Sequence, residues 1–179
     1  MPRGRCTGNS PPVCIVPYLS SFSDDDGDGQ PPSLSTLFAP PKGLMFRGSL
    51  DAAKAEACRK EVWLILNLQN PSEFASHRLN RDTWGDAMVR DLVASNFVCS
   101  QFVATGEEGQ RLASAYKVYD LPAILVLDPF TGALMKQWTG FMSPDRLAEE
   151  LMPFLDHGVL DPAASRLAAA SKRTRPSFA

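Results

Sequence analysis

A nearly continuous apolar run at residues 62–68 constrains the fold of this 179-residue chain more than any other feature. The run reads Val-Trp-Leu-Ile-Leu-Asn-Leu, without the alternation of polar and apolar residues that marks a half-buried strand. It is far shorter than the ~20 residues that a membrane-spanning helix needs, so no transmembrane segment is expected. A short run of this kind is typical of a strand covered on both faces, which predicts a central sheet between two layers of helices.

The remaining elements follow from capping residues, turn residues and apolar periodicity. Helices are expected at residues 50–60 (capped by Ser49), 86–95, 107–116 and 144–155, and Pro71 and Ser72 are expected to open another helical stretch. Strands are expected at residues 97–103, 123–127 and 133–138, with a turn at residues 128–132. Two helices have predicted buried faces, formed by Met88, Val89, Leu92 and Val93 and by Leu147, Leu151, Phe154 and Leu155.

The order of these elements, α-β-α-α-β-α-β-β-α, resembles the thioredoxin plan. It places a βαβ unit before a hairpin and a closing helix, which predicts an α/β fold with a central mixed sheet flanked by helices. Leu121-Pro122 stands where the thioredoxin fold has a cis-proline, and cis peptide bonds are essentially confined to X-Pro. A trans proline that simply starts a strand is the alternative.

Redox chemistry is not expected, because the residues that it needs are missing. A thioredoxin-like enzyme carries a cysteine at the start of the helix after the first strand of its βαβ unit, where the helix end lowers the thiol pKa. Residues 69–76 read Gln-Asn-Pro-Ser-Glu-Phe-Ala-Ser. Cys58 precedes the strand and Cys99 lies within the next one, so neither replaces the missing pair. Without a thiolate there is no thiol–disulfide exchange, and the chain is predicted not to be an enzyme.

The sequence does not predict a metal, nucleotide or nucleic-acid binding site either. Asp24, Asp26 and Asp28 match the first half of a calcium-binding loop, but two prolines interrupt it and its last position lacks a glutamate. His77 and His157 stand alone, and there is no nucleotide-binding fingerprint, so neither a metal nor another cofactor is expected. The net charge of −2 gives no general attraction to nucleic acid.

Composition divides the chain into three parts. Residues 1–36 are rich in Pro, Ser, Gly and Asp and are expected to form a disordered tail, because they cannot bury enough apolar surface to offset their ordering entropy. Residues 37–162 are expected to form one domain, and residues 163–179 a basic C-terminal tail.

Several segments of the domain resemble the UAS domain of UBX-domain proteins, in the subtype that also carries a ubiquitin-associated domain. They are Phe38-Ala-Pro-Pro, Gly48-Ser-Leu50, residues 63–70, Phe74-Ala75, Leu79-Asn-Arg-Asp-Thr-Trp84, Glu107-Glu-Gly-Gln-Arg111 and Asp128-Pro-Phe-Thr-Gly132. The resemblance covers residues 37–162. The flanking ubiquitin-associated and UBX domains are not expected in this chain, because residues 1–36 show no helical pattern and the ~17 residues after Pro162 are too few for a domain.

The resemblance implies a non-catalytic interaction module in ubiquitin-dependent protein degradation, linked to the valosin-containing AAA ATPase and located in the nucleus, the cytoplasm or both. Implied partners are ubiquitinated clients or ubiquitin-ligase components, and the ATPase itself where a UBX domain is present. Some UAS relatives bind long-chain unsaturated fatty acids, so fatty-acid sensing is the alternative function. A thioredoxin-like redox enzyme is the third.

Four residues are candidates for partner binding. Phe74 and Trp84 are large aromatic residues in the helical region, and their alternative role is core packing. Leu121 and Pro122 border the edge that receives extended peptides in active thioredoxins, where the backbone can pair with a strand.

Overall fold

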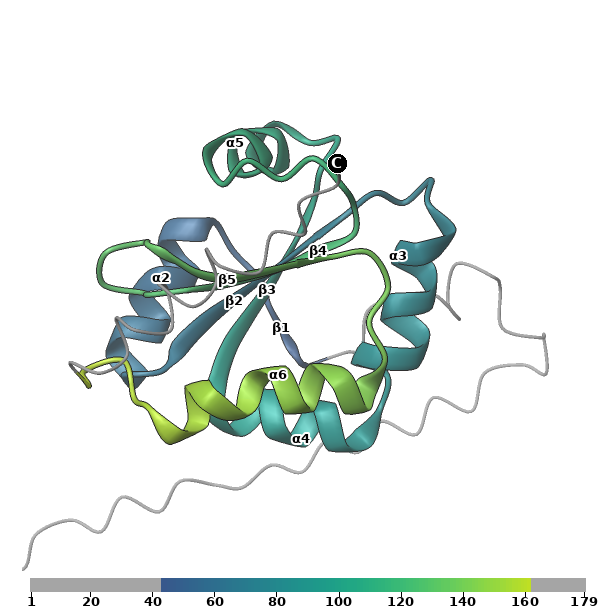
Figure 1. Ribbon diagram of the computed structural model, residues 1–179. Helices are drawn as coiled ribbons and strands as arrows, with labels where there is room; N and C mark the ends of the chain where they lie inside the picture. The colour runs from purple at the N-terminus through teal and green to yellow at the C-terminus, as the bar shows by residue number, and fades with distance from the viewer. Residues whose placement is uncertain (1–42, 162–179) are drawn as a thin grey trace, which may run out of the picture. The chain divides into compact units, whose positions relative to one another are not determined.

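The computed structural model describes residues 43–161 and places a five-stranded mixed sheet at their centre (Figure 1). The strands are β1 (Met45–Phe46), β2 (Trp63–Gln69), β3 (Phe97–Val103), β4 (Ala123–Leu127) and β5 (Leu134–Thr139). They are ordered β1-β3-β2-β4-β5: β1 and β2 run parallel to β3, whereas β4 is antiparallel to both β2 and β5. The predicted α/β, thioredoxin-like architecture is therefore confirmed.

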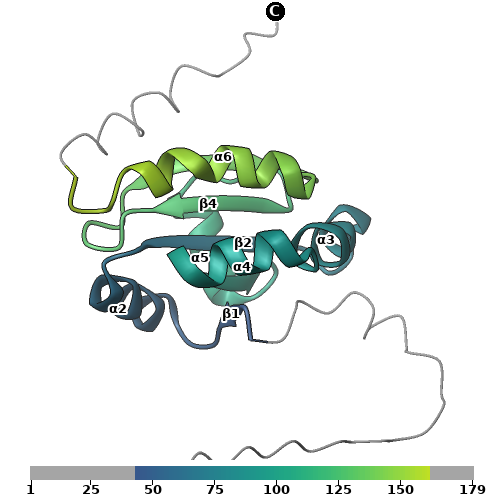
Figure 2. The same ribbon diagram turned by 90° about the horizontal axis from the view of Figure 1, so that it is seen from below.

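Helices cover both faces of this sheet, as the double-sided apolar run requires. They are α2 (Leu50–Lys60), α3 (Phe74–Arg78), the π-helix η1 (Leu79–Trp84), α4 (Ala87–Asn96), α5 (Glu107–Ala115) and α6 (Pro144–Asp156). Buried residues of α4, α6 and η1 form one core layer and those of α2 and α5 form the other. Figures 1 and 2 show α4 and α6 together on the first face.

Strand β2 divides its side chains between the two layers. Trp63 and Ile65 pack with η1, α4 and α6, whereas Leu64, Leu66 and Leu68 pack with α2 and α5. Because successive side chains of a strand point to opposite faces, a strand buried on both sides has no polar face. This is the physical reason for the apolar run.

Helix α3 begins later than the sequence predicts. Pro71 and Ser72 do not open it; they lie in a turn in which the Ser72 N–H donates to Asn70 Oδ1 at 3.1 Å and the Glu73 N–H donates to the Asn70 carbonyl at 3.0 Å. A side chain that accepts from the backbone two residues later forms such a turn and competes with helix. The helix therefore starts at Phe74.

Three further details differ from the sequence-based expectations. Met88 was expected on the buried face of α4, but it is 49% exposed, and only Val89 and Val93 are fully buried there. Strand β1 was not predicted, since two residues carry no period; it exists because Met45 and Phe46 pair with β3. The predicted cap Ser143 precedes α6 in extended backbone, but its side chain accepts no capping hydrogen bond.

Helix α2 has two caps, one local and one distant. Ser49 Oγ accepts from the Ala52 N–H at 3.3 Å, which confirms the predicted cap. Glu108 Oε1, from the first turn of α5, accepts from the Leu50 N–H at 2.8 Å. The Glu108 carboxylate thus links the start of α5 to the start of α2 by a hydrogen bond.

The expected tails at residues 1–36 and 163–179 lie outside the described residues. So do the calcium-loop aspartates and the Phe38-Ala-Pro-Pro segment. Within residues 43–161, no helix is both long and apolar enough to cross a bilayer.

Candidate functional site

The turn between β2 and α3, where a redox pair would stand, is filled by a polar network. Asn70 Nδ2 donates to Glu73 Oε1 at 3.2 Å, and the Asn70 N–H donates to Ser76 Oγ at 3.2 Å. His77 Nε2 lies 2.8 Å from the Pro71 carbonyl. These contacts fix the turn with amide, hydroxyl and carboxylate groups, none of which is a redox nucleophile.

The two cysteines of the described domain lie away from this turn. Cys99 is buried on β3, with its Sγ 3.4 Å from Met45 Sδ, and burial raises the pKa of its thiol well above the ordinary value. Cys58 lies half-buried on α2, before β2 begins. A buried, protonated thiol is a poor nucleophile, so Cys99 fits a core role.

Leu121 and Pro122 are joined by a cis peptide bond, which settles the cis–trans alternative. Pro122 is buried, and its carbonyl accepts from the Gly140 N–H at 2.7 Å. Leu121 is half-buried and lies outside the β4 ladder, which begins at Ala123. The backbone just before Pro122 therefore lies beyond the end of the pairing of β4 with β2 and β5.

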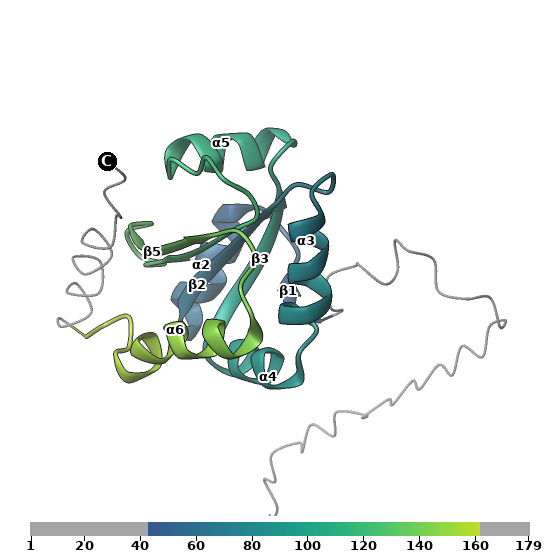
Figure 3. The same ribbon diagram turned by 45° about the vertical axis from the view of Figure 1, so that its right-hand side comes forward.

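The segment after β5 is tied to the helix α3–η1. Arg78 packs its guanidinium 3.9 Å from the centre of the Phe141 ring, and the Thr83 hydroxyl donates to the Met142 carbonyl. Figures 1 and 3 show this segment running beside α3 on its way to α6. Gly140 in turn contacts Pro122, so the cis-proline loop, the segment after β5 and the helix form one connected surface.

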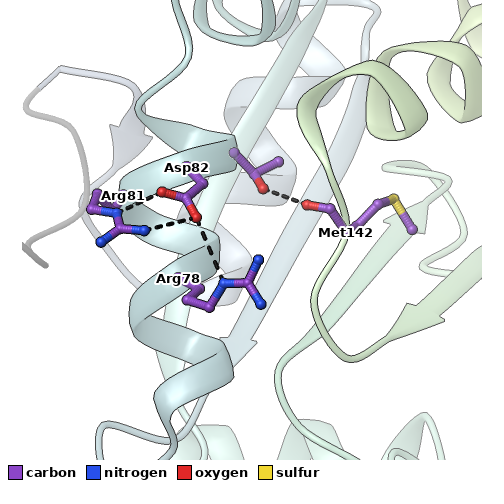
Figure 4. A network of polar contacts seen from close by, with 5 residues as sticks. Arg78, Arg81, Asp82 and Met142 are labelled. Carbon is purple, nitrogen blue, oxygen red and sulfur yellow. Dashed lines mark hydrogen bonds and ion pairs between the residues drawn. The ribbon is translucent and has the colours of Figure 1, made fainter.

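An ion cluster stiffens η1 on its outer side (Figure 4). Asp82 accepts from Arg81 Nε at 2.5 Å and lies 3.7 Å from Arg78 Nε. The Arg81 hydrogen bond lowers the pKa of Asp82, and the same contact raises the pKa of Arg81. The two arginine side chains are about half exposed and that of Asp82 is partly exposed, so solvent screens their attraction and the cluster contributes little to overall stability.

The structure separates the two aromatic candidates. Phe74 is 68% exposed in the first turn of α3, where a partner can reach it. Trp84 is 0% exposed and packs in the core against the sheet, which is its alternative role. Trp84 belongs to the buried face of η1, which also includes Leu79, Asn80 and Thr83. Partner binding by Phe74, Leu121 and Pro122 stays a prediction.

Sequence reasoning missed a polar pocket at the carboxyl ends of β2 and β3. It has a volume of about 170 Å³, and Gln69, Ser76, Asn80, Gln101 and Val103 line it. Gln69 and Asn80 exchange two hydrogen bonds between their side-chain amides, at 2.7 and 2.9 Å. One signal pointed to this pocket: Asn67 and Gln69 interrupt the apolar strand two residues apart, which places both on one face.

Metal binding finds no support in the described domain. Within residues 43–161, no three His, Cys, Asp or Glu side chains gather closely enough to hold an ion. His77 and His157 lie on separate elements, as the sequence indicated.

Comparison with known proteins places the domain. A family model described as thioredoxin-like matches residues 45–129. Plant UBX domain-containing protein 7 of Arabidopsis thaliana is 42% identical over 146 residues, which are 82% of this chain and 31% of the relative. UBX domain-containing protein 5 of Saccharomyces cerevisiae is 36% identical over 133 residues, 72% of this chain and 27% of the relative. The chain thus spans about a third of the length of these curated relatives.

The solved structures agree on the fold. A thioredoxin from Thermus thermophilus superposes with a TM-score of 0.59 at 21% identity, over 68% of this chain and 93% of the thioredoxin. The oxidoreductase DsbH superposes with a TM-score of 0.51 at 12% identity, over 63% of this chain and 85% of DsbH. At such identities the likeness concerns the fold alone. The described domain therefore has a thioredoxin-like fold, and in sequence it is similar to a part of UBX domain-containing proteins.

Proposed function

We propose that this domain is a non-catalytic protein-interaction module of the UBX-adaptor type, acting in ubiquitin-dependent protein degradation. The observation that carries the proposal is the turn between β2 and α3. In a thioredoxin-like domain related to UBX proteins, this turn holds Asn70, Glu73 and Ser76 in place of a cysteine pair. The scaffold is kept while its redox groups are absent from the turn, which leaves binding as its use.

The proposed contact surface joins Phe74 with the backbone at Leu121-Pro122. An exposed aromatic side chain can anchor a partner, and the backbone before the cis-proline can add an extended segment to the end of the sheet. The contacts of Arg78 with Phe141 and of Gly140 with Pro122 hold this surface in one arrangement. A fixed surface binds without the cost of ordering a loop.

The expected partners are ubiquitinated clients or ubiquitin-ligase components, in the nucleus, the cytoplasm or both. Linkage to the valosin-containing AAA ATPase belongs to this proposal for a protein that also contains a UBX domain. Fluorescent tagging of the protein in cells tests the location. Co-precipitation of the ATPase tests the linkage.

The main test is recovery of ubiquitin conjugates from proteasome-inhibited cells on the immobilised chain. Phe74→Asp is expected to lower recovery at least tenfold, because an exposed anchor at an interface centre contributes about 2 kcal/mol or more. Met152→Asp is the matched control, since Met152 is an apolar residue on α6 that is 50% exposed. Equal recovery by the wild type, Phe74→Asp and Met152→Asp would refute the proposal, and so would recovery by the wild type no greater than by a heat-denatured sample of the same chain.

Two measurements address the alternative functions. Reduction of insulin disulfides is expected to proceed no faster with the chain than without it. Turnover that disappears in Cys58→Ser or Cys99→Ser would establish a redox enzyme instead. Fatty-acid sensing stays a prediction from the resemblance. It is tested by titrating the chain with oleate and measuring whether the chain polymerises.

A further inference from the structure

The polar pocket at the ends of β2 and β3 has hydrogen-bond donors that the domain does not use. Gln69 and Asn80 share two hydrogen bonds, and this exchange consumes one N–H and one acceptor of each amide. The second N–H of Gln69 has no partner within the described residues. Gln69 is almost fully buried, so bulk water has little access to that N–H.

Two neighbours add further donors. Ser76 Oγ accepts from the Asn70 N–H at 3.2 Å, and within residues 43–161 its own O–H finds no acceptor. Gln101 Oε1 accepts from Asn67 Nδ2 at 3.2 Å, which leaves the Gln101 NH2 group to the pocket. Three donors from β2, α3 and β3 therefore line one cavity of about 170 Å³.

The three hydrogen-bond donors indicate which chemical group the pocket can bind. Donors without acceptors call for an acceptor, and a carboxylate offers two oxygens with about four lone-pair sites. Hydrogen bonds to an ionised acceptor are roughly twice as strong as neutral ones. No Asp or Glu lines the pocket, so nothing in its wall opposes a negative charge. The cavity is also small, which suits a single functional group.

The proposed function implies that the carboxylate belongs to a polypeptide, and the apolar rim of the pocket is compatible with one. Val103 is 43% exposed at the end of β3, and Pro71 is exposed in the turn opposite. These two apolar side chains can contact the aliphatic part of the residue whose carboxylate enters. We propose that this pocket binds a polypeptide carboxylate, supplied either by a chain's C-terminus or by an acidic side chain.

This inference rests on the proposed function, because it names a chemical group of the partner that the module would bind. It concerns other side chains, however: the pocket is lined from β2, α3 and β3 without Phe74, Leu121 or Pro122, which make up the contact surface proposed above. The two can therefore be tested separately on the same chain.

Nuclear magnetic resonance titration with small probes provides the test. N-acetylglycine supplies a terminal carboxylate, N-acetylglutamic acid α-amide supplies a side-chain carboxylate, and N-acetylglycine amide supplies neither. At least one acid is expected to shift the side-chain NH2 signals of Gln69 and Gln101 and to bind at least tenfold more tightly than the neutral amide. The acid that binds more tightly identifies the source.

Variants check that binding occurs in the pocket. Val103→Glu puts a like charge at an exposed rim position and is expected to weaken acid binding at least tenfold, whereas Met152→Glu on α6 leaves it unchanged. Ser76→Ala removes one donor and is expected to weaken the acid but not the neutral amide. Equal binding of acids and amide, no binding by either acid, or undiminished binding to Val103→Glu would overturn the inference. If Phe74→Asp lowers conjugate recovery at least tenfold in that case, the proposed function stands without this inference.

Discussion

Replacing Gly109 by alanine tests how closely α5 approaches the end of β3. A β-carbon at this buried helical position would lie 2.1 Å from the Val103 carbonyl oxygen and 2.9 Å from the Ala104 Cα atom. Ordinary van der Waals contact begins near 3.4 Å. Both neighbours are backbone atoms that cannot rotate away, so α5 or the end of β3 must shift by more than an ångström.

Two opposing effects set the magnitude. Alanine is favoured over glycine inside a helix by about 1 kcal/mol. Forcing extra volume into a packed site costs about 1–3 kcal/mol, and a clash with backbone belongs at the upper end of that range. The strain therefore wins, and Gly109→Ala is expected to lower the free energy of unfolding by about 1–2 kcal/mol. For a domain of this size that corresponds to a fall in Tm of roughly 4–8 °C.

Urea unfolding and differential scanning calorimetry measure this loss. Ser114→Ala is the matched control: the residue lies exposed on the same helix, and its replacement is expected to leave stability unchanged or slightly higher. A Gly109→Ala protein as stable as the wild type would refute the reasoning, since helix propensity would then outweigh the contact with Val103.

Three other substitutions or titrations follow from single contacts. Trp84→Ala is expected to lower the free energy of unfolding by about 3–5 kcal/mol because the side chain fills the core, whereas Phe74→Ala changes it by less than about 0.5 kcal/mol; urea unfolding compares them. Glu108→Ala removes the distant cap of α2 and is expected to cost about 1 kcal/mol by the same assay, while Glu107→Ala, which loses only an exposed pair with Arg111, costs less than about 0.5 kcal/mol. The hydrogen bond from Arg59 lowers the pKa of Glu56 from 4.5 to about 2, so the stabilisation by the ionised form is present above pH 4.5 and is lost as the pH falls through about 2. A pH titration followed by nuclear magnetic resonance of the Glu56 carboxyl carbon checks that pKa. Arg59→Gln is expected to return the pKa of Glu56 toward 4.5, and an unchanged pKa in the variant would contradict the role of Arg59.

Much of the fold could be predicted because short stretches of consecutive residues mark where its helices and strands begin and end. The bounds of α2, β3 and β4 coincide with the expected residues, since each is marked by a cap, an apolar run or a turn next to it. Strand β1 and the late start of α3 could not be found in this way. The first depends on pairing with β3, and the second on an Asn70 side chain that competes for the backbone.

The candidate site was predicted less completely, for a related reason. The sequence identified Phe74, Trp84, Leu121 and Pro122, but residue type alone does not say which aromatic side chain meets solvent. The packing of η1 on the sheet decides this, because Trp84 lies on its buried face. The polar pocket was missed because Gln69 and Gln101 come from neighbouring strands, and Ser76 and Asn80 from the helix that follows.

By itself, the sequence determined the thioredoxin-like order of elements and the absence of a cysteine pair at the start of α3. Both are properties of consecutive residues: apolar periodicity reports how many faces an element buries, and a missing nucleophile is visible at its own position. Only the tertiary structure decided which groups meet, as when Glu108 caps α2 or Gln69 pairs with Asn80. Such contacts join residues that are remote in the chain, and local propensity carries no information about them.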